Sequence, residues 1–368
     1  MRSIVSLRTK PAERMNVPPV TVVVPARNEA AVLHECLQGL RAQDYDAAPE
    51  SGHSDNTGSG TTGASLRIVV VDDGSTDRTG EIAREHAERD SRVTVVRTEG
   101  PPSGWAGKVH ALHVGVEAIG VPTPGEWLLF VDADVQLGPQ ALRHLLNTAE
   151  SSGADLVSTP GGPPPTRSAT WPLLMPQGLQ IISDNASPTG RGRKAFAIGH
   201  CILVNRAYYE KTGGWSALHW RRNEDIAMAT AVRDSGGTTR VVDGLGHVTT
   251  TGVDPFRQGW VSFRKSIVAG TGPSVAVLVG GGLAQIALSL APSATVAVAV
   301  HGRHRRLAEI GALGYAAQCV AHWHTASLMR ANPSLAPLSP LTGALFGCVL
   351  LDGAVQALRG ATSWRGRG

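Results

Sequence analysis

The chain has 368 residues, 42% of them hydrophobic and 17% charged, which excludes an intrinsically disordered chain and a small disulfide-stapled protein. Its four cysteines lie far apart without metal-ligand spacing, which excludes zinc-ribbon, iron–sulfur and thioredoxin-type proteins. The net charge of +4 combines −4 in residues 1–256 with +8 in residues 257–368, so we expect an acidic soluble domain followed by a basic region suited to an anionic membrane surface.

The chain opens with an N-terminal tail, residues 1–17, which carries charges but no apolar stretch long enough for a signal-peptide core. We therefore expect the following domain to stay in the cytoplasm. From residue 20 onward, short β-branched runs alternate with helical patterns. This alternation predicts βαβ units in a mostly parallel sheet, with ligands at the carboxyl ends of the strands. The expected strands are Val20–Val24, Leu66–Val71, Val93–Val96 and Trp127–Val131, and the expected helices are Ala30–Gln43, Thr79–Arg89 and Lys108–Ile119.

Two segments lack this regularity. Residues 47–65 are rich in Ser, Gly and Thr, and we interpret them as a flexible surface insertion without chemistry of its own. Residues 160–193 are rich in Pro and lead into a basic cluster of Arg191, Arg193 and Lys194. A loop over the site and a solvated linker both fit this second segment.

Beyond residue 270 the composition becomes apolar. Residues 273–300, 307–323 and 338–358 are each near the length of a membrane span, although a bundle of buried soluble helices also fits them. A single crossing by residues 273–300 would place the basic segment 301–306 outside, against the positive-inside tendency. A break at residues 291–293 would return it to the cytoplasmic side. Basic residues are sparse here and lack interleaved aromatics, so nucleic-acid binding is not predicted.

Acidic residues follow two of the expected strands. Asp72 and Asp73 come directly after one strand and can accept hydrogen bonds from a base or ribose, with Gly74 making the turn and Ser75 or Asp77 capping the next helix. A capped turn without a ligand fits this segment equally well.

The second acidic pair is Asp132 and Asp134. Residues at i and i+2 of an extended segment project to the same side, so both carboxylates can face one hard cation, Mg²⁺ or Mn²⁺, which would neutralise a diphosphate. A turn stabilised by its own backbone is the alternative. Between the two acidic segments, residues 104–108 form a glycine-bearing loop that enters a helix, where backbone N–H groups and Lys108 could hold phosphate oxygens.

Glu224 and Asp225 begin a further expected helix. Acids at a helix N-terminus often only complement the helix dipole. Opposite a leaving diphosphate, however, a carboxylate is what a general base requires, because it removes the proton of an acceptor hydroxyl.

Six motifs in order carry a family resemblance. They are VVVPARNE (22–29), VDDGSTD (71–77), GWAGKVHAL (104–112), FVDADV (130–135), GHCILVNRAYYEKTGGW (199–215) and NEDIAMATAVRDSG (223–236). Together they resemble family 2 glycosyltransferases with the GT-A fold, over residues 18–260. The apolar tail, residues 261–368, makes the chain most similar to the hopanoid-associated and carotenoid-type members.

The resemblance implies a GT-A type, Rossmann-like α/β domain and a set of site residues. Asp132 and Asp134 would be the DxD positions, with Asp134 the more direct ligand of Mn²⁺ or Mg²⁺. Asp225, beside Glu224, would be the base of a single-displacement, inverting transfer. Contacts to the nucleotide sugar would come from Pro25, Arg27, Glu29, Asp72, Asp73, Lys108, Asp132 and Arg257, and Gly213, Gly214 and Trp215 would shape the acceptor side.

Two positions qualify this picture. The segment 256–260, FRQGW, lacks the Arg that precedes Trp in processive polysaccharide synthases, which favours one sugar added to one acceptor. His247 could supply a third metal ligand from a late loop, although a structural or exposed histidine also fits.

We therefore expect a membrane-bound, cytoplasm-facing, metal-dependent glycosyltransferase that moves a sugar from a nucleoside diphosphate to a hydroxyl, on a lipid or another acceptor. A sugar nucleotidyltransferase would show a glycine-rich basic loop near its first strand, where this chain has only Arg27. A catalytically inactive membrane scaffold with the same fold is the other alternative.

Overall fold

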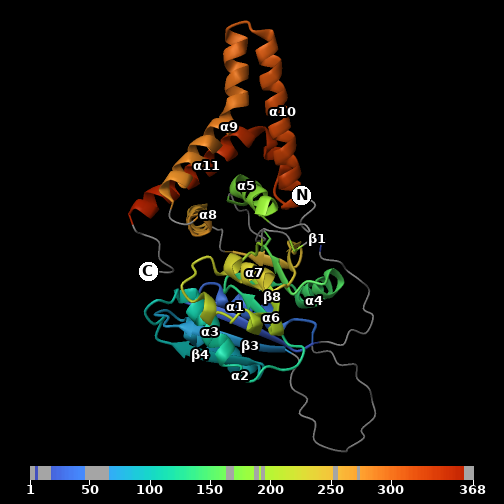
Figure 1. Cartoon of the computed structure of the whole chain (residues 1–368), viewed down its shortest axis with the longest axis vertical. Helices are drawn as coiled ribbons and strands as arrows, with labels where there is room; N and C mark the ends of the chain where they lie inside the picture. Colours follow the sequence, from blue (N-terminus) through green and yellow to red (C-terminus); the bar gives the residue numbers. More distant parts are fainter. Residues whose placement is uncertain are drawn as a thin grey trace, which may run out of the picture. The chain divides into compact units, whose positions relative to one another are not determined.

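The computed structural model describes residues 5–6, 18–45, 66–162, 170–185, 190–191, 195–251, 256–271 and 274–359 (Figure 1). The chain divides into two compact units. The first comprises residues 1–161 and 186–249, and the second comprises residues 162–185 and 250–368. The sequence analysis expects the first domain to end at residue 260. In the structure, residues 162–185 and 250–260 instead belong to the unit that contains the C-terminal helices. The expected insertion at 47–65 lies outside the described residues.

An eight-stranded sheet forms the centre of the first unit. Every neighbouring pair is parallel except the two that involve β8, which runs antiparallel to both β5 and β7. The expected mostly parallel sheet is therefore confirmed. In spatial order the strands are β1 (Val5–Ser6), β9 (Thr239–Asp243), β7 (Leu156–Thr159), β8 (Cys201–Asn205), β5 (Trp127–Val131), β2 (Val20–Ala26), β3 (Leu66–Asp73) and β4 (Val93–Thr98). A small second sheet pairs β6 (Val135–Leu137) with β10 (Val248–Thr250).

The central strands are mostly apolar because both faces of the sheet are covered. On β2, Val22 and Val24 belong to the core on one face, whereas Val23 belongs to the core on the other. The first core also contains side chains of α1 (Leu33–Arg41), α2 (Thr79–Arg89) and α4 (Ala141–Ser152). The second contains side chains of α3 (Gly107–Glu117), α6 (Arg206–Lys211) and α7 (Glu224–Asp234). Helices on both faces thus confirm the expected architecture.

The strands and helices expected between residues 20 and 131 are all present, with ends within three residues of those expected. β1 is an addition, because it lies in the expected tail and pairs with Val242 and Asp243 of β9. Two residues are too few to show a periodic pattern, and their partner lies far away in the sequence.

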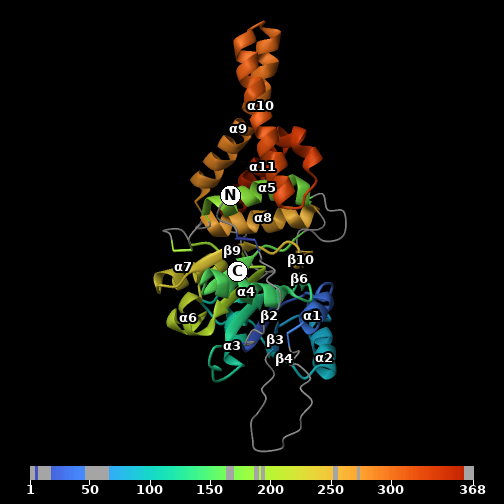
Figure 2. The ribbon, with the colours of Figure 1, turned by 90° about the vertical axis from the view of Figure 1, so that its right-hand side faces the viewer.

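The described residues of the second unit are mainly helical. The helices are α5 (Thr170–Asn185), α8 (Phe256–Thr271), α9 (Val275–His301), α10 (Arg305–Leu328), the 3-10 helix η2 (Pro333–Leu338) and α11 (Ser339–Leu358). α9 lies side by side with both α10 and α11 (Figures 1 and 2). The one acid of α11, Asp352, accepts hydrogen bonds from Trp260 Nε1 at 2.7 Å and Arg264 Nη1 at 2.8 Å. These bonds neutralise the one charged side chain of α11, which is only partly buried.

One expectation for these helices is wrong. The irregular segment expected at 160–193 contains α5, whose internal Pro176 hid the helical pattern. Of the two topologies left open for residues 273–300, the one with a break at 291–293 does not fit the structure, because α9 continues through Pro292. Proline removes the N–H that would bond the carbonyl of Leu288, and Gln318 Nε2 donates to that carbonyl instead, at 3.0 Å.

Among the described residues, two segments are long and apolar enough to cross a membrane, Val275–His301 and Pro333–Leu358. Only 17% of the most apolar window of Val275–His301 is buried. The third expected span, residues 307–323, lies in α10 and is not among them.

Candidate functional site

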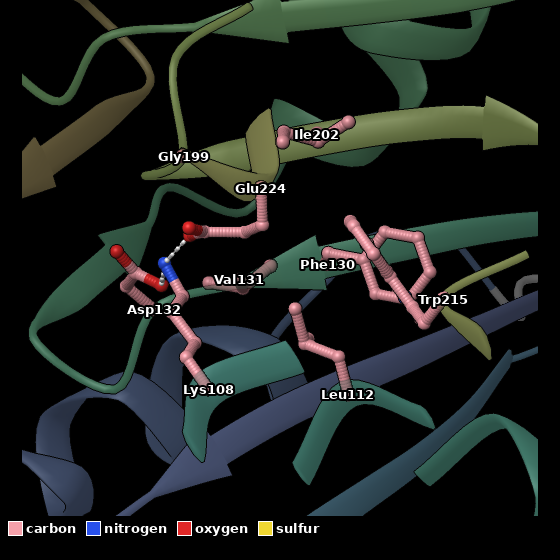
Figure 3. A pocket seen from close by; sticks show the side chains of 9 residues that line it. All are labelled: Lys108, Leu112, Phe130, Val131, Asp132, Gly199, Ile202, Trp215 and Glu224. Carbon is pink, nitrogen blue, oxygen red and sulfur yellow. Dashed lines mark ion pairs between the residues drawn. The ribbon is translucent and has the colours of Figure 1, made fainter. Parts of the chain in front are cut away.

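The carboxyl ends of β2, β3 and β5 lie at one edge of the sheet, because these strands are parallel neighbours. Arg27 and Glu29 follow β2, Asp72 and Asp73 end β3, and Asp132 follows β5. A pocket at the end of β5 is shown in Figure 3. It is lined by Lys108, Leu112, Phe130, Val131, Asp132, Gly199, Ile202, Trp215 and Glu224.

Lys108 joins two acidic segments at this pocket. Its ammonium lies 2.7 Å from Asp132 Oδ1 and 2.7 Å from Glu224 Oε1 (Figure 3). Burial opposes the charge of Lys108, but the two carboxylates outweigh it and raise its pKa above the ordinary value. Lys108 is therefore a permanent cation that holds the DxD segment beside the start of α7.

Asp225 lies beside the same charges. Its Oδ2 accepts a hydrogen bond from the backbone N–H of Gly199 at 3.0 Å, and its Oδ1 accepts one from Ile226 at 2.8 Å. Gly199 is at this edge because β8 is antiparallel, so that the start of β8 lies beside the end of β5. Burial and then the charge of Glu224 raise the pKa of Asp225 to about 7. A carboxylate with a pKa near the working pH suits a general base.

Asp132 and Asp134 offer a metal ion hard oxygen ligands. Both side chains are partly exposed, and the backbone N–H of Val135 closes the turn on the carbonyl of Asp132 at 3.0 Å. In the described part of the chain, no three His, Cys, Asp or Glu side chains cluster as a metal site. Two carboxylates fit a cation whose remaining ligands come from a diphosphate and water, as Mg²⁺ commonly takes them.

The structure does not place His247 in this set. Its ring lies 4.3 Å from the ring of His144, and its backbone carbonyl accepts a hydrogen bond from Gly138 N–H at 2.7 Å. The ring contact places this histidine beside α4, and its role as a third metal ligand stays a prediction.

The two acids expected to contact the nucleoside at the end of β3 are buried and bonded to neighbouring protein groups. The buried carboxylate of Asp73 accepts a hydrogen bond from Thr98 Oγ1 at 2.8 Å and lies 3.8 Å from Arg27 Nη1. Asp72, also buried, accepts one from the backbone N–H of Ser75 at 3.0 Å. Pro25 is buried within β2. The roles expected for these residues toward a nucleotide stay predictions.

The loops after β2 and β3 are locked together. Asn28, in the left-handed region with φ of 53°, donates its N–H to Ser75 Oγ at 3.1 Å, and its side chain accepts the N–H of Thr76 at 2.9 Å. Asp77 accepts the N–H of Thr79 at 3.0 Å at the start of α2, as expected, whereas Ser75 binds the other loop instead. Glu29 is held by its N–H, which donates to Thr79 Oγ1 at 2.8 Å.

Gly214 and Trp215, expected on the acceptor side, lie in the core beneath the pocket. Trp215 is completely buried, with its ring 5.0 Å from that of Phe130. Gly214 has φ of 58°, and a Cβ there would lie 2.7 Å from the ring of Tyr209. Trp215 lines the pocket, and both residues are buried, so neither offers an exposed surface to an acceptor. Arg257 is exposed on α8, in the second unit, and its meeting with the diphosphate stays a prediction.

Two partners of the site carried no role in the sequence analysis. They are Gly199, whose N–H binds Asp225, and Thr98, whose hydroxyl binds Asp73. Thr98 is the last residue of β4, so its position at a strand end next to the acidic turn was a usable signal. No signal in the sequence indicated that Gly199 would contact Asp225, because the position of Gly199 depends on the direction of β8.

One family model matches this chain. The model of the family described as "Glycosyl transferase family 2" matches residues 21–213. The 4,4'-diaponeurosporenoate glycosyltransferase of Staphylococcus aureus (strain USA300) is 26% identical over 268 residues, covering 70% of this chain and 63% of that protein. A solved structure with a similar fold is a mannosyltransferase from Pyrobaculum calidifontis in complex with GDP-Man and Mn²⁺. It has a TM-score of 0.53 and 19% identity, covering 93% of this chain and 87% of that one.

Proposed function

Because the chain belongs to glycosyl transferase family 2, we propose that it transfers one sugar from a nucleoside diphosphate to an acceptor hydroxyl, with inversion at the anomeric carbon. The observation that carries this proposal is the Lys108 bridge, which brings the DxD segment together with Glu224 and the adjacent Asp225. The family match over more than half of the chain argues against a sugar nucleotidyltransferase.

The reaction needs a group that takes the acceptor proton and groups that hold the leaving diphosphate. Asp225, with its pKa near 7, would take the proton while the acceptor oxygen forms its bond to the anomeric carbon and the bond to the diphosphate breaks. Gly199 N–H fixes the orientation of this carboxylate. Lys108, freed from part of its pairing, would bind diphosphate oxygens as a point charge.

Asp132 and Asp134 would hold the metal ion. When bound, Mn²⁺ or Mg²⁺ neutralises the diphosphate and stabilises its departure. The Pyrobaculum structure, which contains GDP-Man and Mn²⁺, supports the choice of ion.

We further propose an acceptor with a long apolar, lipid-like body, because the Staphylococcus relative is named for 4,4'-diaponeurosporenoate, a carotenoid-type carboxylate. That name is a precedent for the apolar body of the acceptor, whereas the attacking group proposed for this chain is a hydroxyl. The two long apolar segments of the second unit support membrane association. Confinement to the bilayer would raise the local concentration of a membrane-dissolved acceptor. The first unit would then face the cytoplasm, where nucleotide sugars are available.

The membrane part is tested with Leu288→Arg. Leu288 is at the middle of α9 and 70% exposed, so arginine there leaves the packing of the helices intact but would stand at the centre of the bilayer, at a cost of about 3 kcal/mol or more. We expect a larger fraction of the variant to be released by alkaline carbonate extraction of membranes. Val121→Arg, at an exposed position of the first unit, is the matched control. Equal extraction of both variants and the wild type would contradict the proposed span.

Donor binding is tested by thermal shift of the purified full chain with UDP-, GDP- and dTDP-sugars, each with and without Mn²⁺. A ligand that binds only the folded state raises the melting temperature, by an amount equivalent to about 2.7 kcal/mol at a hundredfold excess over Kd. We expect one nucleotide to stabilise the protein, and more strongly with Mn²⁺. A folded protein that none of these donors stabilises would count against the proposal.

A further inference from the structure

Trp220 is an exposed aromatic residue close in sequence to the proposed base. It lies on the loop between η1 (Ser216–Leu218) and α7, five positions before Asp225, and its side chain is 54% exposed. Among the described residues of the first unit, no other aromatic side chain is exposed. Scattered exposed apolar residues are ordinary, but an indole next to a catalytic segment offers a large, rigid contact surface.

The loop that carries Trp220 is firmly held. The carbonyl of His219 accepts a hydrogen bond from Ala106 N–H at 2.7 Å, which ties the loop to the residue two positions before Lys108. The ring of Trp105 lies 5.3 Å from the ring of His219. Within the loop, Arg221 N–H donates to the carbonyl of Leu218 at 2.9 Å. The exposure of Trp220 is therefore built into an ordered turn.

A cation also orders the indole itself. The guanidinium carbon of Arg221 lies 5.6 Å from the centre of the Trp220 ring, a cation–π distance. This contact favours one orientation of the exposed indole, which lowers the entropy cost of using it as a contact.

The closeness of Trp220 to Asp225 in the chain indicates that the acceptor, and not the donor, contacts this indole. The diphosphate belongs at Asp132 and Asp134, whereas the acceptor hydroxyl must reach Asp225. Five residues of extended chain span at most about 17 Å, so Trp220 lies within the length of a long acceptor whose hydroxyl is at Asp225. We propose that Trp220 packs against the apolar body of the acceptor and selects isoprenoid-type alcohols over small polar ones. This inference rests on the proposed function.

The test compares two acceptors, geranylgeraniol and glycerol, with the donor that stabilises the protein. Trp220→Ala should raise the KM for geranylgeraniol about tenfold or more, because an indole contact of about 100 Å² is lost. The KM for the donor and the rate of transfer to glycerol should not change. Trp220→Phe should retain most of the affinity, since it keeps an aromatic face. Val121→Ala, at another exposed apolar residue of the first unit, is the control and should leave every constant unchanged.

The outcomes separate this inference from the proposed function. An unchanged KM for geranylgeraniol in Trp220→Ala would overturn the inference, as would an equal rise in the KM for the donor. Wild-type transfer to glycerol but not to geranylgeraniol would overturn the apolar selection while leaving glycosyl transfer in place. Wild-type transfer to neither alcohol, with donor bound, would contradict the proposed function itself.

Discussion

Asp225→Asn is expected to lower the rate of sugar transfer by about two to four orders of magnitude, which is the usual contribution of a general base. The amide of asparagine has nearly the same shape and its oxygen can still accept the N–H of Gly199, but it cannot take a proton at neutral pH. Donor affinity, measured by thermal shift, should therefore stay close to that of the wild type. The test therefore measures both the rate of sugar transfer and the donor affinity of Asp225→Asn and of the wild type.

The control for this variant lies on the same helix. Asp234→Asn changes the same chemical group at the exposed far end of α7 and should keep full activity. Near-normal transfer by Asp225→Asn would remove Asp225 as the base. If Asp225→Asn abolished transfer but kept the cellular role of the protein, the inactive-scaffold alternative would gain support.

The pH dependence of the wild type gives a second measure of the same residue. Burial raises the pKa of Asp225 to about 7, and the carboxylate must be ionised to accept a proton. The value of kcat/KM should therefore be low at pH 5.5, rise through about pH 7 and level off above pH 8, since this constant reports the free enzyme. A constant value across this range would contradict the assignment.

Asp134→Ala is expected to abolish metal-stimulated transfer, with kcat/KM reduced at least about a hundredfold, because it removes one of the two carboxylates that the chain offers a metal ion. The protein should stay folded, since Asp134 is only partly buried. Mn²⁺ is titrated in the presence of the nucleoside diphosphate, and the electron paramagnetic resonance signal of free Mn²⁺ is recorded. This measures metal binding separately from activity.

The matched substitution is Asp234→Ala, which should bind Mn²⁺ as the wild type does. Wild-type activity that persists in the presence of a chelator would defeat the metal requirement. Normal Mn²⁺ binding by Asp134→Ala would instead move the metal site away from the DxD pair.

The sequence alone was enough to predict the strands and helices between residues 20 and 131 and the order of the acidic motifs. These features are local, because a strand segment buried on both faces must be apolar, as in residues 68–71, and a turn shows its own glycine and acids, as in residues 72–77. The same parallel strand order explains why Asp73 and Asp132 could be expected at one edge of the sheet.

Other features were decided only by the tertiary structure, because they depend on partners far away in the chain. The antiparallel direction of β8 brings Gly199 to Asp225, and Lys108, in the first turn of α3, binds both Asp132 after β5 and Glu224 at the start of α7. Gln318 on α10 satisfies the carbonyl that Pro292 leaves unpaired, so a helix continues where local propensity predicts a break. Local patterns set which elements form, whereas the side chains that meet are selected by the pairing and packing of the whole chain.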